Sequence, residues 1–210
     1  MSQPTLIKTE LANALSHGIG ILFAIIASPV LIAVTVQKGN PSLIFAVAFY
    51  CFTMLMMFCF STLYHAFQQP EVKKTLRVFD HISIFFLIGG SYGPFIVLFT
   101  EPKTAFWFLF IQWILIVIGA ILKIFYTGQF RLLSSLIYLG LGCMVFTLGK
   151  GFWLAISTKS MYYLLLGGFF YAVGIYFYQN QKMKNNHLIW HFFVLFAAIS
   201  IYVAVLYGVG

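Results

Sequence analysis

The stretch His187-Leu188-Ile189-Trp190-His191 opens an apolar run, HLIWHFFVLFAAISIYVAVLYGVG, that continues to Gly210. A run of about 20 apolar residues is long enough to cross a bilayer as a helix. Two histidines four positions apart on a helix lie about 40° apart around its axis and one turn apart along it, so both can bind one metal ion. Ionisable side chains inside membrane helices are rare and usually functional. The alternative is that both histidines lie at the head-group level as interfacial anchors.

The composition of the whole chain is that of a membrane protein. Of its 210 residues, 62% are hydrophobic and 20% aromatic, and only 8% are charged. This composition predicts an all-α integral membrane protein. The net charge of +8 is carried by single basic residues scattered between apolar runs, so we expect no nucleic-acid partner. Cys51, Cys59 and Cys143 lie within apolar runs and predict neither a disulfide nor a cysteine metal site.

Apolar runs of membrane-spanning length divide the chain into seven predicted helices joined by short loops. The runs are 15–36, 43–67, 79–99, 105–125, 132–149, 161–178 and 188–209. Residues 1–210 therefore form a single seven-transmembrane domain, with little material outside the bilayer. Any activity must reside within the bundle or at its two faces.

The distribution of basic residues predicts the orientation of the bundle. Seven basic residues lie on the side of the amino terminus and four on the opposite side, and loops rich in Lys and Arg face the cytoplasm. The amino terminus is therefore predicted to be cytoplasmic and the carboxyl terminus outside. The seven are Lys8, Lys73, Lys74, Arg77, Arg131, Lys182 and Lys184, and the four are Lys38, Lys103, Lys150 and Lys159.

Polar residues gather near the cytoplasmic ends of four of these helices. They are Glu10, Asn13 and His17 in the first, Ser61 and His65 in the second, Asp80 and His81 in the third, and His187 and His191 in the seventh. Polar residues that were merely tolerated would be spread over both ends of all seven helices, so we predict one shared site. Imidazoles suit zinc, copper, iron or nickel, and three protein ligands with an open position are typical of catalytic zinc.

With these residues in place, the whole chain resembles the haemolysin III branch of the progestin and AdipoQ receptor family. That family belongs to a superfamily that also contains adiponectin receptors and alkaline ceramidases. Six motifs in order carry the resemblance: Glu10-x-x-Asn13-x-x-x-His17, Ser61-x-x-Tyr64-His65, Phe79-Asp80-His81, Gly90-Ser91-Tyr92-Gly93-Pro94-Phe95, Gly167-Gly168-x-x-Tyr171-x-x-Gly174 and His187-x-x-x-His191. The chain departs from related bacterial sequences at Gly93, where they usually carry Thr.

The resemblance implies a Zn²⁺ ion bound by His65, His187 and His191, with Ser61 and Asp80 lining the site. It also implies a multi-pass protein of the bacterial inner membrane, involved in membrane lipid homeostasis, with a membrane lipid as substrate or ligand. The oligomeric state is left open.

Each of these residues also has a purely structural interpretation. Asp80 can pair with Arg77 at the membrane surface, and Ser61 can return a hydrogen bond to its own helix. His17 and His81 can each replace a zinc ligand on spacing alone, and we place them around the site with Glu10 and Asn13. Glycine pairs at 18/20, 89/90, 140/142 and 167/168 are expected to permit close helix approach.

Three functional hypotheses follow. The first is a zinc-dependent intramembrane hydrolase of acyl-lipid amides or esters, in which Asp80 takes the proton of an activated water and Ser61 helps to hold the developing oxyanion. The second is a non-catalytic sensor or receptor with a structural zinc. The third is a pore former, which is the weakest because polar residues are few away from one end of the bundle.

Overall fold

A computed structural model describes residues 3–210, and the side chains from residue 7 onward. The described chain is helical throughout, with no strand. Six long apolar helices have the length and composition to cross a membrane. They are α1 (Gln3–Val36), α2 (Pro41–Ala66), α3 (Pro70–Phe99), α4 (Pro102–Tyr126), α7 (Thr158–Gln179) and α8 (Asn186–Val209).

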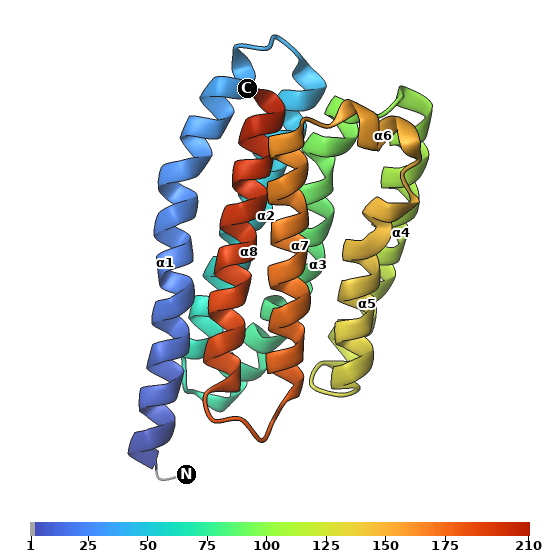
Figure 1. Ribbon diagram of the computed structural model, residues 1–210. Helices are drawn as coiled ribbons and strands as arrows, with labels where there is room; N and C mark the ends of the chain where they lie inside the picture. The colour runs from blue at the N-terminus through green and yellow to red at the C-terminus, as the bar shows by residue number, and fades with distance from the viewer. Residues whose placement is uncertain (1–2) are drawn as a thin grey trace.

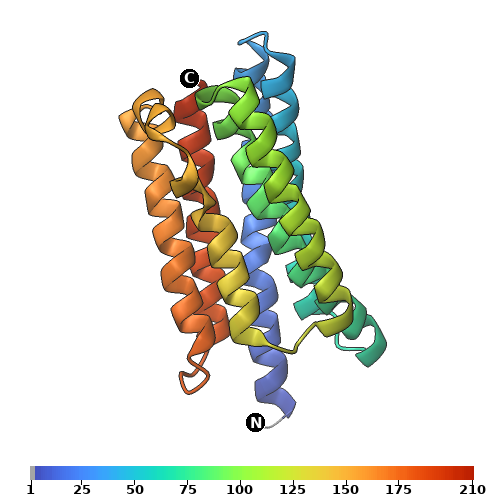
Figure 2. The same ribbon diagram turned by 90° about the vertical axis from the view of Figure 1, so that its right-hand side faces the viewer.

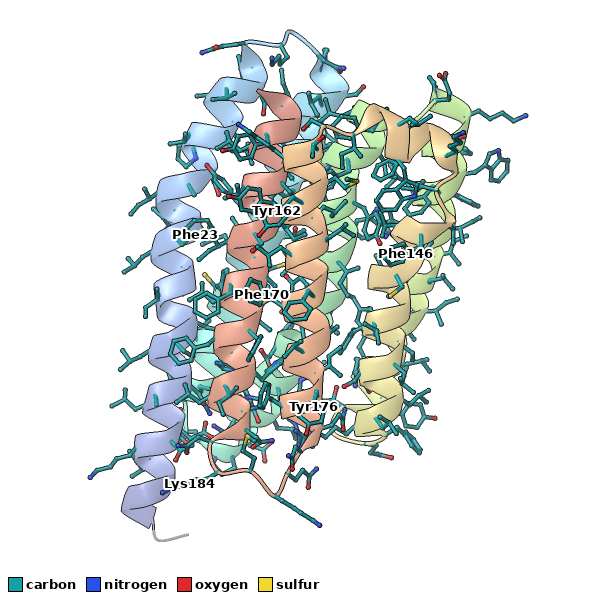
Figure 3. All side chains as sticks on the ribbon, in the orientation of Figure 1. Phe23, Phe146, Tyr162, Phe170, Tyr176 and Lys184 are labelled. Carbon is teal, nitrogen blue, oxygen red and sulfur yellow. The ribbon has the colours of Figure 1, made fainter. Side chains whose placement is uncertain are left out.

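The helices run up and down along one common axis, and α1 begins at the end of the bundle opposite to the end of α8 (Figure 1). Helices α1, α2, α3 and α8 surround the main core, where Tyr50, Phe58 and Ile96 are fully buried. Helix α7 packs along α8, and α4 and α5 stand on the far side of α3 (Figures 1 and 2). Apolar side chains also cover the outside of the bundle (Figure 3), as expected of a surface that faces lipid.

The fifth predicted helix, 132–149, is shorter than expected. Helix α5 (Arg131–Cys143) passes into a 3-10 turn, η1 (Met144–Thr147), and a short helix α6 (Lys150–Ala155) follows. The Tyr92 hydroxyl of α3 fixes this break, because it donates to the carbonyl of Gly142 at 2.5 Å and accepts from the backbone N–H of Val145 at 2.9 Å. The seventeen residues of α5 and η1 extend about 25 Å at 1.5 Å per residue. That this segment crosses the membrane, and that the protein therefore has seven transmembrane helices, stays a prediction.

Two helices extend beyond their predicted starts. Helix α1 begins before residue 15, and α3 begins at Pro70 instead of residue 79. The basic residues Lys73, Lys74 and Arg77, which we expected in a loop, therefore lie on the first turns of α3. Hydropathy detects only the apolar segment of a helix. Proline at the first position, followed by Glu, Lys and Arg, favours a helical conformation whether or not the residues lie in the membrane. The remaining boundaries agree with the prediction to within three residues, apart from the end of α5.

The predicted role of the glycine pairs is only partly correct. A Cβ atom at Gly167 would lie 2.7 Å from Ile201 Cδ1, so this glycine permits the close approach of α7 to α8. Gly20, Gly89 and Gly90 are similarly close to side chains of neighbouring helices. In the described chain, no atom of a neighbouring helix lies within 4 Å of a Cβ atom placed at Gly18, Gly140, Gly142 or Gly168. Helix α5 is therefore not held by glycine contacts, and open space lies beside it.

Candidate metal centre

Three of the predicted histidines converge at the end of the bundle where α2 ends and α8 begins. One ring nitrogen from each of His65, His187 and His191 lies within 4.8 Å of the others. The Nε2 atoms of His65 and His187 are 3.1 Å apart. His65 and His191 are buried and His187 is half-buried. Helical spacing places His187 and His191 on one face of α8, and the packing of α2 beside them supplies His65.

Hydrogen bonds to the outer nitrogens determine which nitrogen each ring presents to the centre. His65 Nδ1 lies 3.1 Å from Glu10 Oε2, and His191 Nδ1 lies 3.1 Å from the carbonyl oxygen of Asn13. Carboxylate and carbonyl oxygens can only accept, so both Nδ1 atoms carry the proton and donate it. Their Nε2 atoms are then unprotonated, which is the form that binds a metal.

The spacing of these nitrogens fits a tetrahedral zinc site. Zinc–nitrogen bonds of 2.0–2.1 Å at tetrahedral angles place two ligand nitrogens about 3.3 Å apart. The separation of 3.1 Å between the Nε2 atoms of His65 and His187 is close to this value. At that distance the unprotonated Nε2 of His65 either accepts a hydrogen bond from His187 Nε2 or shares a cation with it. The three histidines therefore bring together donor atoms that can hold a metal ion, and the hydrogen bonds of His65 and His191 set the tautomer that metal binding needs.

Helix α1 supports the centre from behind. Glu10 Oε2 accepts from His65 Nδ1 and also, at 2.5 Å, from Lys73 Nζ, so the carboxylate connects α1, α2 and α3. Ser16 Oγ lies 2.9 Å from His191 Nδ1 and donates to the Asn13 carbonyl at 2.7 Å. Glu10 and Asn13 lie beside the site as the sequence pattern predicts, whereas Ser16 was not predicted there and Lys73 was expected only as a topology signal. The position of Ser16, three residues after Asn13 on a helix that carries His17, was the signal available for it.

His17 and His81 do not belong to the group of three. His17 stacks on His191 with ring centroids 3.8 Å apart, and within the described chain neither of its ring nitrogens has a hydrogen-bond partner. His81 Nδ1 donates to the carbonyl of Arg77 at 2.8 Å. His17 thus packs directly against a candidate ligand, and His81 is engaged with its own helix.

Asp80 and Ser61 line the cavity that the candidate ligands His187 and His191 also line. Ser61 is buried, and Asp80 is half-buried with Oδ2 3.5 Å from His81 Nδ1. Among the described residues, Asp80 and Arg77 form no ion pair within 4 Å, so the alternative pairing is not seen. The structure therefore brings both predicted residues to the same cavity as the histidines.

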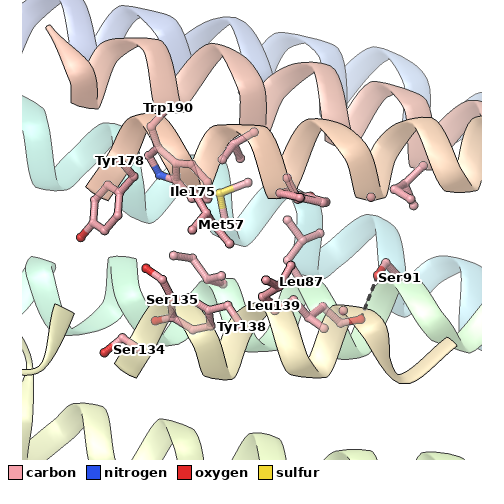
Figure 4. A pocket seen from close by; sticks show the side chains of 18 of the residues that line it. Met57, Leu87, Ser91, Ser134, Ser135, Tyr138, Leu139, Ile175, Tyr178 and Trp190 are labelled. Atoms are coloured by element: carbon pink, nitrogen blue, oxygen red, sulfur yellow. Dashed lines mark hydrogen bonds between the residues drawn. The ribbon is translucent and has the colours of Figure 1, made fainter. Parts of the chain in front are cut away.

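The cavity has a volume of about 520 Å³ and lies mainly between α3, α5, α7 and α8 (Figure 4). It reaches from His187 to Ile201 on α8, which is about 21 Å along that helix at 1.5 Å per residue. Beyond the histidines its lining is mainly apolar, with residues such as Leu87 and Val194. Leu165 and Phe169 of α7 line it and are 43% and 59% exposed, so the cavity is open on the side where α7 faces α5.

Comparison with known proteins gives the same family that the motifs indicate. The family described as Haemolysin-III related matches residues 5–202. Hemolysin-3 of Bacillus cereus is 34% identical over 97% of this chain and 93% of its own length, and the Hemolysin-3 homolog of Bacillus subtilis is 35% identical over 96% and 94%. The human Monocyte to macrophage differentiation factor is 25% identical over 71% of this chain and 64% of its own length. No solved structure matches the chain.

The two bacterial relatives cover the entire arrangement described above, from the α1 residues that support the histidines to the carboxyl-terminal helix that carries two of them. The chain is thus a membrane protein of the haemolysin-III related family.

Proposed function

We propose that this protein is a zinc-dependent intramembrane hydrolase that cleaves an acyl-lipid amide or ester and acts in lipid homeostasis of the bacterial inner membrane. One observation carries the proposal: His187 and His191, together with Ser61 and Asp80, line an apolar cavity that is open on one side of the bundle. A metal centre in the wall of a lipid-sized cavity suits chemistry on a lipid.

The cavity has the dimensions and the chemistry of an acyl-chain site. Its extent of about 21 Å exceeds the half-thickness of the hydrocarbon core, about 15 Å, so it can take one chain of a lipid leaflet. Its apolar lining removes the chain from polar surroundings, and the open side beside Leu165 and Phe169 gives a path from the bilayer. The polar residues at one end would then face the head-group end of the chain, where an amide or ester bond lies.

The polar residues divide the chemistry among them. A bound zinc would supply a Lewis acid that polarises the carbonyl and activates a water molecule. The Asp80 carboxylate would accept the proton of the attacking water, and the Ser61 hydroxyl would donate to the carbonyl oxygen as negative charge develops there. Glu10 and the Asn13 carbonyl hold His65 and His191 in the required tautomer and orientation. The products would be a fatty acid and the amine or alcohol that carried it.

A non-catalytic sensor with a structural zinc is the second candidate. The observation in its favour is that the candidate ligands come from α2 and α8 and that both are hydrogen-bonded to α1, so one ion would connect three helices. Lipid in the cavity would then bias the packing of the bundle without being cleaved. The name of the bacterial relatives suggests lysis, but a cavity with a mainly apolar lining is poorly suited to conduct ions.

Asp80→Asn separates the enzyme from the sensor. Asn keeps the shape of the side chain but cannot take a proton, so zinc content should be unchanged while turnover falls by about 10²–10⁴-fold. Detergent-solubilised wild type and variant would be incubated with a panel of lipid amides and esters, and free fatty acid would be followed by mass spectrometry. Glu71→Gln is the matched control, because Glu71 is an exposed carboxylate in the first turn of the same helix.

One result would contradict the hydrolase. It is a zinc-loaded wild type that releases no fatty acid from any lipid while Asp80→Asn still alters membrane composition in cells, which would favour the sensor. Loss of zinc from Asp80→Asn would contradict the ligand assignment instead, because it would make Asp80 a ligand and remove one histidine from the proposed set.

A further inference from the structure

Three cationic side chains line the end of the cavity beside the metal centre. They are Arg77 of α3, Lys123 of α4 and Arg131 of α5, and we call them the cationic mouth. Lys123 is only 6% exposed although it lies within an apolar helix of membrane-spanning length. Its Nζ donates to Ser134 Oγ at 2.5 Å. Arg77 reaches toward the same turn. A Cβ atom placed at Gly128, in the α4–α5 connection, would lie 2.8 Å from its guanidinium, so the guanidinium packs directly against this glycine.

The cationic mouth has too little negative charge around it. The chain has four acidic residues, and the ion pairs that they make within 4 Å in the described chain join Glu10 to His65 and Lys73, and Asp80 to His81. Asp80 is the carboxylate that lines the same cavity. Three cations therefore face one carboxylate, and an ammonium buried in a membrane helix without a counter-ion is costly. This imbalance indicates that an anion binds here.

Further hydrogen-bond donors point to the same place. The Arg131 guanidinium stacks on the Tyr178 ring at 3.8 Å and donates through one terminal nitrogen to the Tyr178 carbonyl, while its buried Nε has no hydrogen-bond partner within the described chain. Arg131 is also the first residue of α5, and Phe130 before it makes no side-chain cap hydrogen bond. The first backbone N–H groups of a helix attract anions, so α5 adds to the positive potential of the cluster.

We propose that the cationic mouth binds the phosphate of an anionic glycerophospholipid whose acyl chain lies in the apolar cavity. The inference rests on the proposed function, since it names the lipid class that the same cavity takes. A lipid fits better than free phosphate because the hydrogen-bond donors and the apolar residues line one cavity, and this cavity is open on the side of the bundle beside Leu165 and Phe169. The bond that joins the acyl chain to the head group then lies at the end of the cavity that His187 and His191 also line. Figure 4 shows Ser134 and Ser135 across the cavity from Tyr178 and Trp190 at this end.

The test is selective lipid binding, measured by native mass spectrometry of the detergent-purified full chain. Phosphatidylglycerol and phosphatidylcholine with identical acyl chains would compete at equal concentration. We expect wild type to retain phosphatidylglycerol at least about tenfold better, because three cations favour a lipid of net negative charge over one whose choline carries a positive charge. Lys123→Gln and Arg77→Gln should each lose most of this preference, because each removes one of these positive charges. Arg77 is exposed, so its variant folds even if the buried position at Lys123 does not tolerate Gln.

Lys184→Gln is the matched control. Lys184 is an exposed lysine at the same end of the bundle, in the α7–α8 connection and away from the cavity lining (Figure 3). Its variant should keep the full preference for phosphatidylglycerol. Equal binding of the two lipids by wild type, or an equal loss in Lys184→Gln, would overturn the proposal. Displacement of phosphatidylglycerol by millimolar inorganic phosphate would also overturn it and assign the cluster to free phosphate.

The outcomes distinguish this proposal from the hydrolase. Binding is read without turnover, and zinc content is measured in the same samples. Selective binding that depends on Lys123 in a protein without hydrolytic activity would refute the enzyme and keep the head-group assignment. Hydrolysis without any preference for the anionic lipid would refute only the head-group assignment.

Discussion

Glu10→Gln tests whether α1 supports the metal centre as the hydrogen bonds indicate. In wild type the carboxylate accepts from His65 Nδ1 at 3.1 Å and from Lys73 Nζ at 2.5 Å. The Gln amide oxygen can still accept from His65, so the ring should keep its tautomer. What is lost is the negative charge, which raises the basicity of the imidazole and strengthens its bond to a metal. We therefore expect weaker zinc binding with an intact fold.

The expected magnitude follows from the number of contacts that change. Loss of a group that supports a ligand typically costs 10–100-fold in metal affinity. Glu10 supports one of the three histidines and shares its charge with Lys73, which places the effect near the lower end. We expect about a tenfold increase in the zinc Kd, equivalent to about 1.4 kcal/mol.

The assay is competition for zinc between the detergent-purified protein and a chromophoric chelator. Glu71→Gln makes the same change on an exposed carboxylate and should leave the zinc Kd at the wild-type value. Circular dichroism would establish that both variants keep their helix content. An unchanged Kd in Glu10→Gln would refute the reasoning, because the Glu10–His65 contact would then contribute nothing to the metal centre.

Three further predictions concern the metal, the topology and the fold. Mass spectrometry of purified wild type should find about one zinc per chain, and His65→Ala, His187→Ala and His191→Ala should each lose it; a wild type without metal would refute the centre. Reporter fusions after Gly210 and near Lys184 should give opposite answers, and a cytoplasm-only reporter that is active at Gly210 would reverse the predicted orientation. Tyr92→Phe should lower the free energy of unfolding by about 1–3 kcal/mol, because it leaves the buried polar groups at the α5–η1 break without partners. A thermal melt would measure this loss, and the exposed Tyr162→Phe should leave the Tm unchanged.

The membrane helices and the identity of the clustered histidines are determined by the sequence alone. Hydropathy over a window is a local property, so it located all six long helices. The spacing of His187 and His191 places them on one face of a helix before any tertiary contact is known. The short loops then bring His65 to the same end of the bundle, because consecutive helices must run in opposite directions. These local rules account for the convergence that the structure shows.

The extent of the helices depended on information that hydropathy does not contain. Lys73 lies in α3 because helix propensity continues beyond the apolar segment, and there it reaches Glu10 of α1. Helix α5 ends early because Tyr92, about fifty positions earlier in the chain, bonds to its last turn. A residue so distant in sequence leaves no mark in the local pattern of 132–149.

Only the tertiary structure decided how the site is built. The nitrogen that each ring presents depends on partners such as Asn13 and Ser16, which are more than 170 positions from His191 in the chain. The cationic mouth likewise combines α3, α4 and α5, and its single basic residues looked like ordinary topology signals in the sequence. Hydrogen bonds and electrostatic forces act between atoms a few ångströms apart, whatever the sequence separation of their residues. The pattern of the chain can therefore determine which residues a helix carries to one end of the bundle, and the packing of the helices determines which atoms meet there.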